Sequence, residues 1–123
     1  GLGDVYKRQI DCSSGGIGGS PVLTKAKIIP GFQVPYSQKI KKEANVNTMA
    51  VGAIIDPHQA EDIILKQRAD LVALGRELLA DTQWVYKAAS IFELPNAKSF
   101  LPESYSFYLS RRDEYLDRKA KPA

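Results

Sequence analysis

A short apolar run that ends in a glycine and an arginine constrains this chain most. Residues 70–74 read Asp-Leu-Val-Ala-Leu, and Gly75 and Arg76 follow directly. A run without polar alternation predicts a strand covered on both faces, as in a parallel α/β sheet. Gly75 lets backbone N–H groups approach a ligand, and Arg76 offers a planar fork of donors that matches phosphate oxygens. The pattern favours an anion-binding turn, although any turn can recruit a glycine.

A second apolar run lies upstream, at residues 48–55, and it also carries a glycine, Gly52. Asp56 suits a helix N-cap and Pro57 the first helical position, so we expect a helix over residues 57–67. The residues that would form its inner face are Ala60, Ile63, Ile64 and Gln67.

Together these segments predict one β-α-β unit with a right-handed crossover. Two successive strand ends carry glycine, and the second is followed by arginine. This matches the phosphate site that (β/α)8 barrels build from the loops after strands seven and eight. Ordinary glycines of strand-to-helix turns are the alternative interpretation.

Four blocks of the chain extend this pattern: residues 10–16, 30–36, 50–52 and 69–81. In their order and spacing they resemble the old yellow enzyme family, most closely the bacterial branch of NADPH-dependent FMN ene-reductases. The resemblance implies an α/β fold: the C-terminal third of a (β/α)8 TIM barrel, about strands six to eight with their helices. It also implies that the FMN phosphate is held by Val51, Gly52, Gly75 and Arg76.

The resemblance implies a parent enzyme in which NAD(P)H reduces FMN and the flavin reduces the C=C bond of an activated alkene. It implies a homo-oligomer, and it places Ser13 and Ser14 near the flavin. The family's catalytic side chains lie outside this chain, so we assign no catalytic residue and no metal ligand here. The one histidine, His58, is expected to be exposed at a helix start.

The length of the chain limits this interpretation, and two alternative functions remain open. The 123 residues cannot close eight strands, because a complete barrel needs about 250 residues. The chain alone is therefore expected to be inactive. A phosphate-binding barrel enzyme without redox chemistry would use the same glycine and arginine ends. An inactive half-barrel that associates through its open strand edges is the other alternative.

The chain divides into three expected parts. Residues 1–9 share nothing with the family and are predicted to be a non-native lead. Residues 10–95 would form the partial FMN-binding barrel, with further helices over 35–44 and 82–93. Residues 96–123 would form a C-terminal tail that frays after residue 117.

The composition argues against several kinds of partner and location. The formal net charge is +3, and Lys39, Lys41 and Lys42 are expected to form a solvated helix face, so no nucleic-acid partner is predicted. No apolar stretch reaches the roughly 18 residues that a membrane span requires. The single cysteine, Cys12, excludes an internal disulfide, is expected in the core, and suits a cytoplasmic protein.

Overall fold

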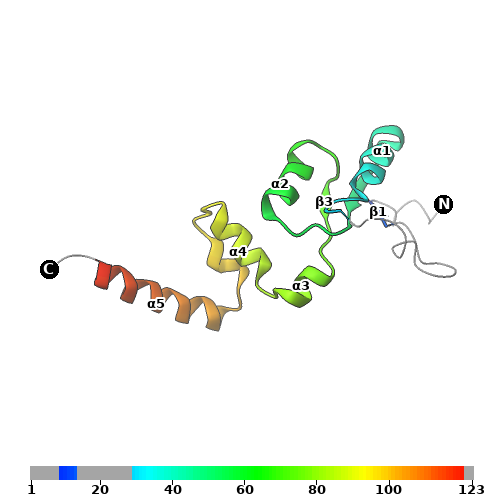
Figure 1. Cartoon of the computed structure of the whole chain (residues 1–123). Helices are drawn as coiled ribbons and strands as arrows, with labels where there is room; N and C mark the ends of the chain where they lie inside the picture. The colour runs from blue at the N-terminus through cyan, green and yellow to red at the C-terminus, as the bar shows by residue number, and fades with distance from the viewer. Residues whose placement is uncertain (1–8, 14–28, 121–123) are drawn as a thin grey trace, which may run out of the picture. The chain divides into compact units, whose positions relative to one another are not determined.

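The computed structural model describes residues 9–13 and 29–120, which contain a small parallel sheet and helices (Figure 1). The chain divides into two compact units, Gly1–Ala80 and Asp81–Ala123. No helix in the described residues is both long and apolar enough to cross a bilayer.

The first unit is built on three strands, β1 (Gln9–Cys12), β2 (Asn47–Ala50) and β3 (Leu71–Val72). The sheet order is β1-β2-β3 and both pairings are parallel. Ala50 lies opposite Cys12 on one side and Val72 on the other. The predicted parallel α/β arrangement is confirmed.

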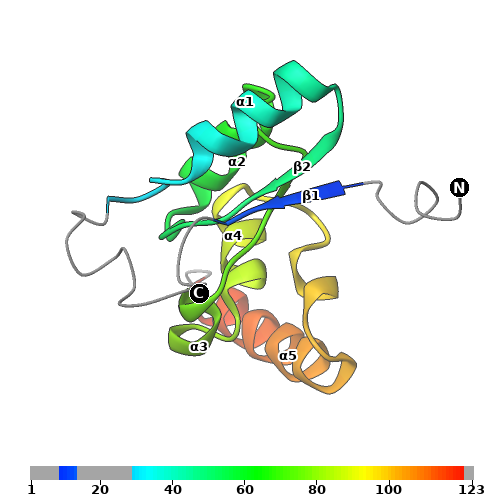
Figure 2. The same cartoon turned by 90° about the vertical axis from the view of Figure 1, so that its right-hand side faces the viewer.

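Two helices connect these strands, α1 (Val34–Ala44) before β2 and α2 (Pro57–Leu65) before β3. Both lie on the same side of the strands (Figure 2). The Asp56 carboxylate caps α2 by accepting a hydrogen bond from the His58 N–H at 3.2 Å, as predicted. The helix ends at Leu65, two residues before the predicted end. Gln67, the predicted last residue, instead adopts a left-handed conformation with φ of 52°.

The core of this unit lies between the helices and the sheet. Its buried members are Val34, Ala50, Ile54, Ile63 and Ala69, with Ala60, Val72 and Leu74 packed against them. The predicted inner face of α2 is confirmed at Ala60 and Ile63 but wrong at Ile64 and Gln67, which are exposed. Ile63 and Ile64 are adjacent, and only Ile63 turns toward the sheet. Cys12 is buried, as expected.

The strands are shorter than predicted. β2 stops at Ala50, because Gly52 and Ala53 turn the chain with φ of 125° and 51°. β3 contains only Leu71 and Val72. The prediction that this strand is covered on both faces is wrong for Leu71, which is 49% exposed. In the described sheet β3 also pairs only with β2, so its other edge has no strand neighbour.

Asp70, which lies just before β3, connects this part of the chain to β2 and α1. Its carboxylate accepts a hydrogen bond from the Thr48 N–H at 2.8 Å and forms an ion pair with Lys41. Lys41 therefore does not belong to the solvated face predicted for α1. Ser37, fully buried on the same helix, donates toward the carbonyl oxygens of Val34 and Arg68.

The second unit contains α4 (Trp84–Ile91), a 3₁₀ helix η2 (Ala97–Phe100) and α5 (Glu103–Ala120). The predicted helix over 82–93 is thus confirmed in its centre. Just before α4 begins, the Asp81 carboxylate accepts a hydrogen bond from the Gln83 N–H at 3.1 Å. Residues 118–120 continue α5, so the predicted fraying is wrong there, and residues 121–123 lie outside the described residues.

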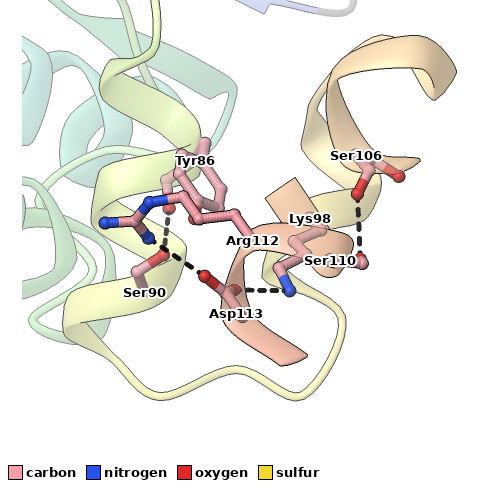
Figure 3. Close-up of polar contacts among 7 residues, drawn as sticks. All are labelled: Tyr86, Ser90, Lys98, Ser106, Ser110, Arg112 and Asp113. Atoms are coloured by element: carbon pink, nitrogen blue, oxygen red, sulfur yellow. Dashed lines mark hydrogen bonds and ion pairs between the residues drawn. The ribbon is translucent and has the colours of Figure 1, made fainter. Parts of the chain in front are cut away.

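An ion pair joins α5 to η2. Lys98 and Arg112 approach the Asp113 carboxylate at 2.7 Å and 3.0 Å (Figure 3). The hydrogen bond from Lys98 is the main cause that lowers the pKa of Asp113, and Arg112 adds to it. Nearby, the hydroxyls of Ser90 and Ser110 donate to backbone carbonyls four residues earlier in their own helices.

Candidate functional site

The four residues predicted to hold an anion lie together in the structure. Val51 and Gly52 follow β2, while Gly75 and Arg76 follow β3. Because β2 and β3 are parallel neighbours, their carboxyl ends meet at one edge of the sheet. All four residues line two adjacent hollows of about 360 Å³ and 140 Å³.

The turn after β2 requires a glycine at position 52. Its φ of 125° is a conformation that side chains rarely tolerate. A Cβ here would lie 3.1 Å from Phe32 Cε1 and 3.2 Å from Gln33 Cβ. The Gly52 carbonyl also accepts a hydrogen bond from the Gly31 N–H at 2.8 Å. The loop before α1 and the turn after β2 therefore support each other.

Gly75 differs from Gly52. A Cβ on Gly75 would meet no atom within 4 Å, and Gly75 is not among the glycines with positive φ. Neither folding nor packing within the described residues therefore demands glycine at this position. The space above its Cα is open, so the close approach of a ligand to Gly75 remains a prediction of the sequence.

Arg76 begins a short helix, α3 (Arg76–Ala80), and its side chain is exposed. Within the described ranges 9–13 and 29–120 it is the one arginine without a carboxylate partner. The other described arginines all form ion pairs: Arg68 with Asp62, Arg112 with Asp113, and both Arg111 and Arg118 with Glu114. An unpaired guanidinium beside two glycines is an available anion ligand.

Sequence reasoning missed several residues that line the hollows. Phe32 and Gln33 join the smaller hollow from the loop before α1, and Ala53 joins both hollows. Glu77 adds a carboxylate to the larger one. The segment 30–36 was among the recognised blocks, but its spacing did not reveal that it packs on the Gly52 turn.

Other predicted neighbours of the site have mixed outcomes. Ser13 lines the smaller hollow, while Ser14 lies outside the described residues. Burial, with the nearby Asp11 charge as a second cause, raises the pKa of the Cys12 thiol, so this group stays protonated at neutral pH. His58 is exposed in the first turn of α2, as expected, and lines neither hollow.

The residues present fit a phosphate group. A dianionic phosphate needs charge-assisted donors and close backbone approach. Arg76, which has no carboxylate partner among the described residues, supplies the charge, and Gly75, which has no side chain, leaves room for the approach. Glu77, in the larger hollow, is the one acidic side chain among the residues that line these two hollows.

Comparison with known proteins shows the family of this chain. The model of the NADH:flavin oxidoreductase / NADH oxidase family matches residues 3–94. The chain belongs to this family. A TIM barrel is the fold that membership implies, and the parallel sheet of the first unit accords with it.

Similar members of the family are named NADPH dehydrogenases. Those of Geobacillus sp. (strain WCH70) and Bacillus subtilis (strain 168) are 49% and 44% identical over 80 residues, which is 65% of this chain. That of Clostridium acetobutylicum is 43% identical over 96 residues, or 78% of the chain. The chain spans only 22% to 26% of the length of these family members.

The family match begins at residue 3, and residues 1–8 lie outside the described residues. The non-native lead over residues 1–9 and the division at 95 and 96 therefore remain predictions. β1 itself begins at Gln9, one residue before the predicted partial barrel.

Proposed function

We propose that this chain is the C-terminal third of an FMN-dependent NAD(P)H oxidoreductase. In this proposal β1, β2 and β3 are strands six, seven and eight of a (β/α)8 barrel. Family membership and the parallel order β1-β2-β3 support it. The names of the relatives support NADPH as the reductant.

In this proposal, the residues of this chain bind the phosphate of FMN. Val51 and Gly52 would offer backbone at one strand end, and Gly75 and Arg76 backbone and charge at the next. The observation that carries the proposal is the Arg76 guanidinium, which has no carboxylate partner in the described part of the chain, at the hollows that all four residues line. Loss of one such charged contact costs about 1.5–3 kcal/mol of binding free energy.

When bound, FMN would supply the redox chemistry, which is hydride transfer between NAD(P)H and an activated alkene. The residues of this chain bind and orient the cofactor's phosphate end. Side chains that would contact the alkene belong to the remainder of the protein, and a homo-oligomeric parent is part of the proposal. Family membership favours this function over a phosphate-binding barrel without redox chemistry.

The test compares Arg76→Ala with Lys42→Ala in the complete protein that contains this chain. Lys42 is an exposed cation on α1 that lines neither hollow, so it controls for the loss of a positive charge. We expect Arg76→Ala to weaken FMN binding about tenfold or more, and Lys42→Ala to leave it unchanged. Equal FMN retention by both variants after dialysis would remove the assignment of Arg76.

A further inference from the structure

The two hollows at the proposed phosphate site share one set of residues and differ in another. The shared residues are Val51, Gly52, Ala53, Gly75 and Arg76. The smaller hollow adds Ser13, Phe32 and Gln33. The larger hollow adds Ile54, Ile55, Ala73, Glu77 and Ala80. Because the shared residues cannot distinguish the two hollows, the place of a bound phosphate depends on the residues that differ.

Glu77 gives the two hollows different charges. It is half-buried in α3 and lines only the larger hollow. Its carboxylate forms no ion pair with a lysine or arginine in the part of the chain that the structure describes. The lining side chains therefore carry a formal charge of +1 at the smaller hollow, from Arg76, and of zero at the larger one, from Arg76 and Glu77. A phosphate dianion would be attracted to the first and would meet a like charge in the second.

The other side chains that differ favour the same hollow. Those of the larger hollow are aliphatic, namely Ile54, Ile55, Ala73 and Ala80. Aliphatic groups cannot replace the hydrogen bonds that a phosphate loses when it leaves water. The smaller hollow adds the hydroxyl of Ser13, which can donate a hydrogen bond. Charge and wall chemistry thus both favour the smaller hollow.

We propose that Glu77 is a specificity-determining residue that keeps the phosphate of FMN out of the larger hollow and confines it to the smaller one, beside Arg76 and Ser13. This inference rests on the proposed function and deepens it, because it assigns the phosphate to one of two neighbouring hollows. Glu77 acts through its charge and does not contact the bound phosphate.

The first experiment fills one hollow at a time in the complete apoprotein. Ala80→Phe fills the larger hollow and Ser13→Phe the smaller one, since each exposed residue lines only that hollow. Flavin fluorescence measures the dissociation constants of FMN and of riboflavin, which lacks the phosphate. The ratio of the two constants isolates the contribution of the phosphate, and circular dichroism reports the folding of each variant.

We expect Ser13→Phe to reduce the preference for FMN over riboflavin at least about tenfold, and Ala80→Phe to keep it within about twofold of the parent. Should Ser13→Phe fail to fold, Ser13→Leu takes its place. A preference that is lost in folded Ala80→Phe, or kept in the folded Ser13 variant, would overturn this inference alone. Failure of the unmodified protein to bind either flavin would overturn the proposed function with it.

The second experiment removes the charge of Glu77 and keeps the size of its side chain. We expect Glu77→Gln to tighten FMN binding about threefold to tenfold at low ionic strength and to change riboflavin binding less than about twofold. Added salt should reduce this gain. Glu61→Gln, an exposed carboxyl on α2 that lines neither hollow, is the matched control and should change neither constant. Unchanged FMN binding in folded Glu77→Gln would overturn the role of Glu77.

Discussion

At the scale of single residues, the sequence predicted which residues lie together at the candidate site, because glycines and an arginine that follow apolar runs are visible in a sequence. Gly52, Gly75 and Arg76 stood out as glycines and a cation after apolar runs, and the structure brings them together. Gln33 could not be found this way. Gln33 packs against Gly52, which is 19 residues further along the chain. No local sequence pattern predicts a contact over that separation.

The two glycines separate folding from binding. Gly52→Ala would force a side chain into a φ of 125° and against Phe32, so we expect it to destabilise the protein by about 1–3 kcal/mol. Gly75→Ala meets open space and should change the unfolding free energy by less than about 0.5 kcal/mol. Urea unfolding of both variants tests this, and equal destabilisation would contradict the account.

Asp70 should make stability depend on pH. The hydrogen bond from Lys41, followed by that from the Thr48 N–H, lowers the pKa of this carboxyl in the folded state. Its contribution is therefore present above the unfolded value of about 3.9 and is lost as the pH falls toward the folded pKa. We expect Asp70→Asn to lower the urea midpoint at pH 7, with a smaller difference from the parent at pH 3.

Glu43→Gln, an exposed carboxyl on α1, is the matched control for this change. It should leave the urea midpoint nearly unchanged at both values of pH. The role of Asp70 would be refuted if the difference between Asp70→Asn and the parent stayed the same from pH 7 to pH 3.

At the scale of elements, helices were easier to predict than strands. The limits of α1 and the start of α2 follow from local signals, such as Pro57 after Asp56. The ends of β2 and β3 do not, because an apolar residue reads the same in a strand and in the turn that follows it. Helix α5 was not predicted, although Tyr105, Tyr108 and Leu109 recur at helical spacing in the sequence, and none of its 18 residues is buried in the structure.

The packing of α2 makes a prediction at this scale. Ile63 is fully buried against the sheet, whereas its neighbour Ile64 is 37% exposed. Ile63→Ala should cost about 2–5 kcal/mol of the unfolding free energy, and Ile64→Ala about 1 kcal/mol or less. Chemical denaturation of the two variants gives the comparison. Similar costs would mean that α2 packs through a different face.

At the scale of the whole molecule, β3 has one neighbour in the described sheet, and half of the Leu71 surface is exposed. In a closed barrel, a strand of this position would have neighbours on both sides. The chain spans 22% to 26% of the length of its relatives. We infer that a further strand of the complete protein pairs with the open edge of β3.

The measurement that tests this account most directly is the visible spectrum of the complete purified protein, before and after anaerobic addition of NADPH. The account predicts a flavin band at about 450 nm that NADPH bleaches, because the site beside Arg76 holds FMN and the parent enzyme reduces it. A colourless protein that gains no such band when incubated with FMN would contradict it.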